Sequence, residues 1–400
     1  MGENERRAWV QLALTPYIGP ESFLQLLQHF GSAQAALAAS AEQIRNIVRH
    51  KQAASAWADT EKRRLAEQAA EAALAWEMRD GCRLLLLHDS DFPLMLAEGI
   101  TPPPLLFARG QTEYLSRPAV AVVGSRHATP QALRIAQEFG AALSGQGITV
   151  VSGMAAGIDT AAHQGALRHN GGTVAVWGTG IDRVYPAANR RLAHEIAEKG
   201  LILSEFPLDT RPLAGNFPRR NRLIAALSHA TLVVEAAPAS GSLITAALAA
   251  EMGREVMAVP GSIDNPHSKG CHQLIKSGAK LVECLDDILQ ECPALLQNLL
   301  SSAYSVMPTK KTPDAKPPQA ATAGFQTALP SVHETVAAVA PVMPSENEAL
   351  LAAMGYDPVH PDTLADQLAW PAEEIYARLL ELELEGTVAA AAGGRYQRVA

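Results

Sequence analysis

The chain of 400 residues has few cysteines, few aromatic residues and no long hydrophobic run. Its four cysteines form no C-x-x-C pair and have no histidine at a zinc-ligand spacing, so we expect reduced thiols rather than disulfides or a metal site. These cysteines are Cys82, Cys271, Cys284 and Cys292. No segment reaches the roughly 18 apolar residues of a transmembrane helix, and the start, "MGENERRAWVQLAL", lacks the apolar core of a signal peptide. These absences predict a globular, cytoplasmic protein that does not enter a membrane.

The acidic charge is concentrated at the end of the sequence. The whole chain has a formal net charge of -8. Residues 345–400 contain ten acidic residues and three arginines, which leaves a net charge of only -1 for the other 344 residues. Because salt screens charges beyond about 8 to 10 Å, a nearly neutral body can still carry a local basic patch. The overall charge therefore does not exclude an acidic partner.

Composition divides the chain into four segments. Residues 1–78 are rich in Ala and Leu with helical periodicity, and predict a small helical domain of the SAM or helix-hairpin-helix type. Its turns either serve helix packing alone or offer amides to DNA phosphates. Residues 299–344 hold seven prolines and predict a flexible linker. Residues 345–400 contain three helical segments and a hairpin with a Gly-Gly turn, which predict a winged helix.

The remaining segment, residues 79–298, consists of short apolar runs that alternate with helical stretches. The runs are "LLLLH", "LLFARG", "VAVVGS", "ITVVSG", "TVAVWG", "LILSEF", "LVVEA", "EVMAVPG" and "KLVECL". Continuous apolar strands alternating with helices are typical of a mostly parallel sheet covered on both faces. The predicted fold class is α/β, with an extended, doubly wound Rossmann-like sheet. A ligand is expected at the carboxyl ends of its strands.

Several of these runs end in Gly and Ser just before a helix. The residues concerned are Gly124, Ser125 and Arg126 in "VVGSRHATP", Ser152 and Gly153 in "VVSGMAAGID", and Gly241 and Ser242 in "PASGSLITAAL". Amides at such turns bind anions, although each loop could also be only a tight turn of the sheet. No G-x-x-x-x-G-K-[ST] motif occurs, and "GTGIDR" lacks the third glycine of a dinucleotide motif. We therefore expect no conventional NAD or ATP site.

A basic cluster follows the strand "LILSEF". The stretch "NFPRRNR" contains Asn216, Phe217, Arg219, Arg220, Asn221 and Arg222. Three arginines alone would be interpreted as a solvated surface or a set of ion pairs. Here they accompany an aromatic ring and two amides, and the topology places them on the same strand-end rim as Arg126. Guanidinium donors beside an aromatic face suit single-stranded nucleic acid, whose bases are unpaired and whose phosphates are regularly spaced.

A longer series of motifs resembles one protein family. The series "VGSR", "SGMAAGID", "GTGIDRVYPAAN", "SEFPLDTRPLAGNFPRRNRLIAALS", "VVEAAPASGSLITAALAAEMGREVMAVPG" and "GCHQLIKSGA" is similar to the DNA-processing protein A family, DprA or Smf, over roughly residues 119–285. The resemblance implies a protein that is not an enzyme and needs no cofactor or metal. Members bind and protect single-stranded DNA during natural transformation, load the RecA recombinase onto it, and act as homodimers through the Rossmann domain.

The resemblance also implies roles for single residues. Arg126 and the arginines of "NFPRRNR" would hold phosphates, Phe217 would stack on a base, and Lys276 would add charge to the pocket wall. Hydrogen-bond donors would come from Gly124, Ser125, Ser152, Gly153, Gly241 and Ser242. Leu274 and Ile275 map loosely onto the family's dimer face and RecA contact.

Three alternatives remain open. Asp159 and His163 are four residues apart on a predicted helix, a spacing that permits metal ligation, although a capping Asp and a partly buried His explain it as well. A nucleotide or phosphoribosyl hydrolase could use Asp182, Glu205, Glu235 and Glu251; for a DNA-binding protein, Glu205 and Glu235 would instead orient arginines. A purely structural assembly protein is the third.

The predicted winged helix is an unusual DNA reader. Its candidate recognition helix, "PAEEIYARLLELELEG", carries five acids and one arginine. Such a helix would lose the counterion-release term that drives duplex binding, so we expect a protein-binding or regulatory role for this domain. Only the predicted wing tip, "GGRYQR", has the charge to contact phosphate.

Overall fold

The computed structural model describes residues 1–296, 346–354, 359–368, 370–384, 386–391 and 395–398. The predicted linker, residues 299–344, and the Gly-Gly turn of the predicted hairpin lie outside the described residues. The chain divides into two units, Met1–Leu300 and Ser301–Ala400, which are treated separately below. The domain boundaries at residues 78 and 298 stay predictions.

The nine apolar runs form the nine strands of one sheet. The strands are β1 Cys82–Leu86, β2 Leu105–Gly110, β3 Ala119–Val123, β4 Thr149–Ser152, β5 Thr173–Val176, β6 Leu201–Ser204, β7 Ala230–Val233, β8 Glu255–Ala258 and β9 Lys280–Leu281. Their order is β1-β2-β6-β5-β4-β3-β7-β8-β9. From β6 to β9 all pairs are parallel, whereas β1, β2 and β6 pair antiparallel. The predicted doubly wound, mostly parallel sheet is confirmed.

The strand order reverses direction at β3. From β3 the chain adds β4, β5 and β6 on one side, then returns to place β7, β8 and β9 on the other. In open α/β sheets a ligand binds at such a switch point, outside the carboxyl ends of the strands. The loops after β3 and β7 therefore flank the expected site.

Helices cover both faces of the sheet. One face packs against α8 Pro130–Gly145, α9 Ile158–Ala166 and α14 Leu285–Glu291, and nearer β6 against α10 Arg190–Lys199. The other face packs against α7 Met95–Gly99, α11 Asn216–Ala226, α12 Gly241–Glu251 and α13 Lys269–Lys276. The central strand β3, "AVAVV", is buried at every position, because both of its faces are covered. Short 3-10 segments lie at Thr112–Ser116, Ala187–Asn189 and Pro266–Ser268.

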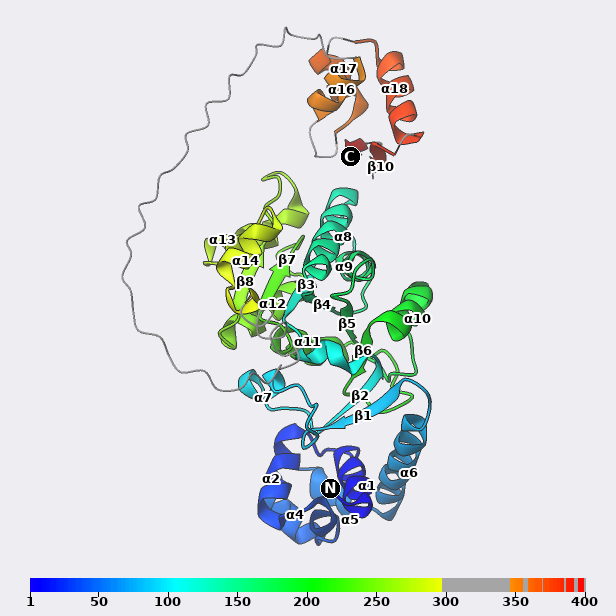
Figure 1. The fold of residues 1–400 in the computed structure, drawn as a ribbon, viewed down its shortest axis with the longest axis vertical. Helices are drawn as coiled ribbons and strands as arrows, with labels where there is room; N and C mark the ends of the chain where they lie inside the picture. Colours follow the sequence, from blue (N-terminus) through cyan, green and yellow to red (C-terminus); the bar gives the residue numbers. More distant parts are fainter. Residues whose placement is uncertain (297–345, 355–358, 369, 385, 392–394, 399–400) are drawn as a thin grey trace, which may run out of the picture. The chain divides into compact units, whose positions relative to one another are not determined.

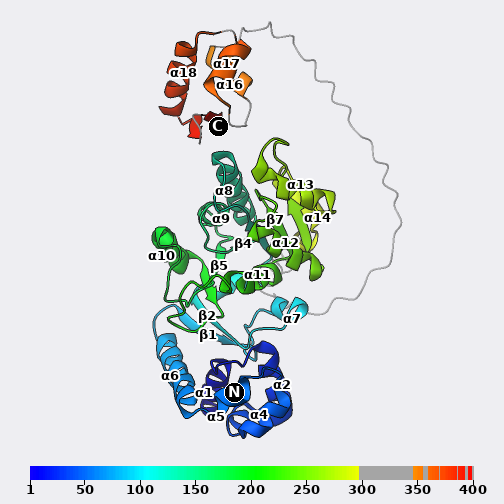
Figure 2. The same cartoon turned by 180° about the vertical axis from the view of Figure 1, so that it is seen from behind.

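The first six helices pack beyond the β1–β2 edge of the sheet, a position that both views show (Figures 1 and 2). They are α1 Glu3–Ala13, α2 Pro20–Phe30, α3 Ala33–Leu37, α4 Ala41–Ile47, α5 Ala53–Ala58 and α6 Thr60–Glu77. The indole of Trp9 donates to the carbonyl of Pro104 at 2.8 Å, and Trp76 meets Phe107 edge to face at 5.5 Å. The helices thus share a hydrophobic core with the outer strands.

The second unit contains the predicted three helices and hairpin. The helices are α16 Glu346–Met354, α17 Pro361–Leu368 and α18 Ala372–Leu384, and the strands are β10 Val388–Ala391 and β11 Arg395–Arg398. The strands pair antiparallel, and an isolated bridge joins Val359 to Tyr396. Leu350, Leu364 and Leu379 are fully buried in a small core. This is the arrangement of a winged helix.

Candidate functional site

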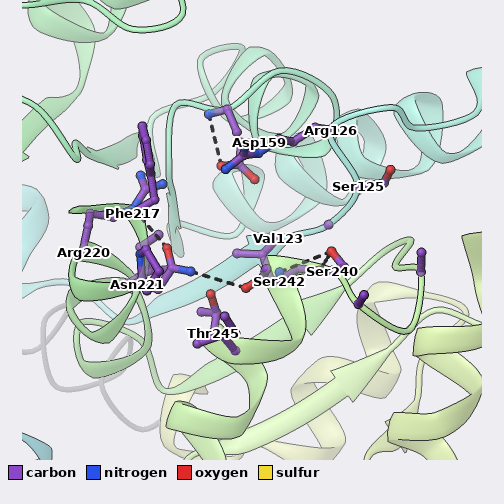
Figure 3. A pocket seen from close by; sticks show the side chains of 18 of the residues that line it. Val123, Ser125, Arg126, Asp159, Phe217, Arg220, Asn221, Ser240, Ser242 and Thr245 are labelled. Carbon is purple, nitrogen blue, oxygen red and sulfur yellow. Dashed lines mark hydrogen bonds between the residues drawn. The ribbon is translucent and has the colours of Figure 1, made fainter. Parts of the chain in front are cut away.

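A cavity of about 750 Å³ opens at the switch point of the sheet. In Figure 3, Phe217, Arg220 and Asn221 of α11 lie at the left, Thr245 of α12 lies below Asn221, and Ser242 and the N-cap Ser240 lie further to the right. The loop after β3, with Ser125 and Arg126, forms a further wall together with Asp159 of α9. The predicted strand-end rim and the predicted basic helix therefore meet in one site.

Backbone hydrogen bonds tie the loops of this rim together. The amide of Ser125 donates to the carbonyl of Glu235 at 2.7 Å, and the amide of Ile158 donates to the carbonyl of Ser125 at 3.1 Å. Gly157 has a φ of 82°, and a Cβ there would lie 2.2 Å from the Ser125 carbonyl oxygen. The Ser125 amide is therefore part of the framework, not the unpaired anion donor that the sequence suggested.

The helix α11 divides its polar residues between two faces. Phe217, Arg220, Asn221 and Ile224 follow the i, i+3, i+4, i+7 spacing of one face, and all four line the cavity. Arg219 and Arg222 are absent from the cavity lining. Both pair with the buried carboxylate of Glu205, Arg219 at 3.6 Å and Arg222 more closely. Glu205 thus orients two arginines, as the sequence suggested, but outside the cavity.

Arg220 is a buried cation. Only 5% of its surface is exposed. Its guanidinium donates to the carbonyl of Val176, and its Nε donates to the Asn221 side chain at 3.2 Å. Burial lowers the pKa of Arg220 to about 10, and the carboxylate of Asp159 opposes this shift. Gly153 leaves room for the pair, because a Cβ there would lie 2.4 Å from Arg220 Nη1 and 2.5 Å from Asp159 Oδ2.

Asp159 and His163 are both buried and interact electrostatically with Arg220. Burial raises the pKa of Asp159, although Arg220 and the Ala155 amide favour the charged form; that amide donates to Asp159 Oδ2 at 3.3 Å. Both ring nitrogens of His163 have partners, Thr173 Oγ1 at 2.7 Å and the Gly153 carbonyl at 2.6 Å. Burial lowers the pKa of His163 to about 4, so the ring is neutral at pH 7. Within the described residues, no three His, Cys, Asp or Glu side chains converge as metal ligands.

Arg126 is the exposed cation of the cavity. Its guanidinium lies 5.6 Å from the centroid of the half-buried Phe217 ring, and Tyr185 lies 5.6 Å from the same ring. No carboxylate of the described chain lies within ion-pair distance of Arg126. A smaller apolar chamber of about 160 Å³, lined by Trp177 and Met154, shares Arg126, Tyr185 and Phe217 with the main cavity. Aromatic faces and an unpaired guanidinium therefore stand together at the entrance.

The sequence matches the family profile "DNA recombination-mediator protein A" over residues 83–293, more than half of the chain. The chain belongs to the DprA family. The profile of a DprA-like N-terminal HHH domain matches residues 3–58, and that of the DprA winged helix domain matches residues 334–394. The resemblance seen in the motifs and the three-part architecture are both confirmed.

Individual DprA relatives agree with this assignment. Protein Smf of Synechocystis is 37% identical over 328 residues, which cover 79% of this chain and 80% of the relative. The DNA processing protein DprA of Streptococcus pneumoniae is 47% identical over 203 residues, covering 51% of this chain and 72% of the relative. A crystal structure of S. pneumoniae DprA superposes with a TM-score of 0.60 at 36% identity and covers 71% of this chain and 98% of that one.

The remaining residues that the DprA resemblance singled out lie in different settings. Gly124 and Gly241 line the cavity, as does Ser242, whose amide is bonded to Ser240 Oγ at 3.3 Å. Ser152 is buried and its hydroxyl donates to the Val122 carbonyl at 2.7 Å. Asn216 is buried, and its side-chain amide donates to the Gly178 carbonyl at 3.2 Å.

The predicted residues of α13 lie outside the cavity. Lys276, Leu274 and Ile275 are absent from its lining. Lys276 therefore does not add charge to the wall that contains Arg126, contrary to the expected position. Leu274 and Ile275 are partly buried and pack against the core on one face of the sheet.

Several cavity residues escaped the sequence analysis: His127, Tyr185, Thr245 and His267. Tyr185 could have been found, because it belongs to "GTGIDRVYPAAN", which the family resemblance already included. Thr245 follows Ser242 by three residues on α12 and so shares its helix face. His267 belongs to the segment after β8, and no local sequence pattern predicts that it lines this cavity.

The acids of the alternative hydrolase are dispersed. Glu235 accepts from Thr129 Oγ1 at 2.8 Å and thereby holds the start of α8, instead of orienting an arginine. Asp182 accepts from the Asp209 amide at 2.9 Å, and Glu251 is exposed at the end of α12. Among the described cavity residues only Asp159 is acidic. The pair of carboxylates that glycosidic cleavage ordinarily needs is therefore not assembled by these residues.

No helix in the described ranges combines the length and the apolar composition needed to cross a bilayer.

Proposed function

We propose that this DprA-family protein binds single-stranded DNA in the switch-point cavity, with a phosphate at Arg126 and a base against Phe217. It then passes the strand to a RecA-type recombinase during natural transformation. The observation that carries the proposal is the contact between Arg126 and Phe217, because it places an unpaired cation and an aromatic face at one entrance. Stacking of a base on an aromatic side chain contributes about 1–3 kcal/mol and tolerates any base.

The charges of the cavity support a polyanionic ligand. Asp159, the acid of the described lining, is offset by the buried Arg220. This leaves Arg126 as the cation whose charge faces solvent, with His127 beside it and His267 on the same cavity. A single exposed charge is screened beyond about 8 to 10 Å, so the contact with the strand must be direct. Affinity for the strand should therefore depend strongly on salt.

A salt series distinguishes the phosphate contact at Arg126 from base stacking on Phe217. Binding of labelled oligo-dT would be followed by fluorescence anisotropy for the wild type, Arg126→Ala, Phe217→Leu and the control Arg168→Ala, which removes an exposed arginine outside the cavity. Arg126→Ala should lower affinity and flatten the plot of log K against log salt by about 0.7, the value for one phosphate on a single strand. Phe217→Leu should weaken binding by about 1–3 kcal/mol and keep the slope. An unchanged slope in Arg126→Ala would contradict the proposed phosphate contact.

Delivery to RecA and dimer formation form the second part of the proposal. Ile263, between β8 and α13, and Leu281 of β9 are exposed large apolar residues, and β9 is a two-residue strand at the edge of the sheet. Such an edge offers unpaired backbone groups and apolar surface to a second copy. We propose this surface, with Leu274 and Ile275, as the dimer and RecA contact.

Dimer formation and delivery to RecA are tested by separate measurements. Light scattering should give a dimer for the wild type and a monomer for Ile263→Asp/Leu281→Asp. RecA-dependent ATP hydrolysis on strand already coated with a single-strand-binding protein should rise when the wild type is added. A double variant that stays dimeric would remove this surface from the proposal and leave the DNA site untouched.

A further inference from the structure

A second basic surface lies next to the proposed DNA site. A groove of about 270 Å³ is lined by Arg109 of β2, by Arg190 and His194 of α10, and by the loop after β5. The helix α10 lies beside β2 and β6 (Figure 1), and Arg109 is paired in register with Ile202 of β6. Three cationic or titratable side chains from two elements therefore converge on one depression.

The arginines of this groove are free to meet an anion. Arg109 and Arg190 are exposed, and no hydrogen bond, ion pair or ring contact engages either of them within the described residues. Arg190 and Arg191 occupy the first turn of α10, which has no acidic residue, although a helix start favours acids. The acid of the groove, Asp182, has both carboxylate oxygens on the Asp209 amide, at 2.9 and 3.0 Å. The two guanidinium groups of the groove therefore exceed its single carboxylate by one positive charge.

The groove adjoins the cavity through one shared wall. Trp177 lines both the groove and the apolar chamber, and the chamber shares Arg126 and Phe217 with the main cavity. In the same loop, Val184 faces the groove and Tyr185 faces the chamber. The groove therefore begins one residue along the loop from the chamber.

We propose that the groove between α10 and β2 holds the phosphodiester backbone of single-stranded DNA beyond the cavity, with Arg109 and Arg190 as phosphate contacts. This inference rests on the proposed function. It adds that the bound strand continues from the cavity into the groove, where its phosphates contact a second set of arginines. It makes the length of the bound strand exceed what the cavity alone can hold.

The test uses the full chain and two lengths of oligo-dT, about 4 and about 16 nucleotides, which span the site sizes of single-strand-binding folds. Arg109→Ala and Arg190→Ala should each flatten the salt slope by about 0.7 on the long strand and leave the short strand unaffected. Arg168→Ala is the matched control, since it removes an exposed arginine that borders neither cavity nor groove. Thermal melting checks that each variant keeps the wild-type fold.

The outcomes separate the groove from the cavity. If the groove variants behave like Arg168→Ala on the long strand while Arg126→Ala still flattens the slope, the groove proposal is wrong and the proposed function stands. Equal losses on short and long strands would also overturn the groove as an extension. If the wild type binds neither strand, both proposals fail together.

Discussion

The cavity face and the outer face of α11 carry arginines from the same seven-residue stretch in opposite settings. Arg220, on the cavity face, is buried, and the carboxylate of Asp159 favours its charged form. Arg219, on the outer face, has 62% of its side chain exposed, near Glu205 and over the ring of Phe206. The exposed cation of the cavity, Arg126, comes from a different loop altogether. The position of an arginine on α11, and not its residue type, therefore decides whether its side chain is buried in the fold or exposed to solvent.

Removing Arg220 should have the largest effect. Arg220→Leu would remove the charge that offsets the buried Asp159, and leaving a buried charge uncompensated in this way costs about 3–5 kcal/mol. Urea denaturation would measure the free energy of unfolding, with Arg219→Leu as the control on the outer face. A loss below about 1 kcal/mol for Arg220→Leu would show that the two faces do not differ in this way.

The buried ring of His163 should make the stability of the protein depend on pH. Burial lowers the pKa of His163 from 6.5 to about 4, so between these values the unfolded chain binds a proton that the folded chain does not. Stability should therefore fall as pH falls from about 6.5 to 4, by about 3 kcal/mol for this group. Unfolding followed across this range should show a shallower acid-side decline for His163→Gln than for the wild type. His169→Gln, at an exposed position, should keep the wild-type profile.

A methyl group at residue 153 tests the packing around the pair. A Cβ on Gly153 would lie within 2.5 Å of both Arg220 and Asp159, so Gly153→Ala should lower the free energy of unfolding by about 1–3 kcal/mol, as overpacking does. Gly145→Ala is the matched control, because its Cβ would meet His169 at an ordinary 3.9 Å. That control should be neutral or slightly stabilising. Equal denaturation midpoints for the two variants would mean that the buried pair can move aside cheaply.

The sequence predicted the fold better than the roles of individual residues. Each apolar run became a strand, and the five central strands, β3 to β7, are buried at every position, as a strand covered on both faces must be apolar along its length. The start of α8 was also predictable, since Thr129 caps it and Pro130 follows. The cavity residues Arg220 and Asn221 could have been separated from Arg219 by their three- and four-residue spacing from Phe217.

Contacts between distant segments were beyond the sequence. Nothing near Ser125 shows that its amide would donate to the carbonyl of Glu235, or that Asp159 would be buried within electrostatic reach of Arg220, sixty-one residues later. Both contacts depend on how β3, β4 and β7 lie side by side in the sheet. Glycines indicated that close contacts exist, since Gly153 and Gly157 lie where another segment approaches closely. A glycine in a sequence does not show which segment approaches it.

The smallest effect is expected on the outer face. Arg219→Ala removes a largely exposed guanidinium 3.6 Å from the buried Glu205, which keeps its closer partner Arg222, so the loss of stability should be about 0–1 kcal/mol. Arg219 lies outside the cavity lining, so the salt slope for oligo-dT should match that of the wild type, in contrast to Arg126→Ala. Anisotropy across a salt series and urea denaturation measure both quantities on the same preparation. A slope flattened by about 0.7 in Arg219→Ala would mean that the strand crosses the outer face of α11 as well, and the division between its two faces would then hold for stability but not for binding.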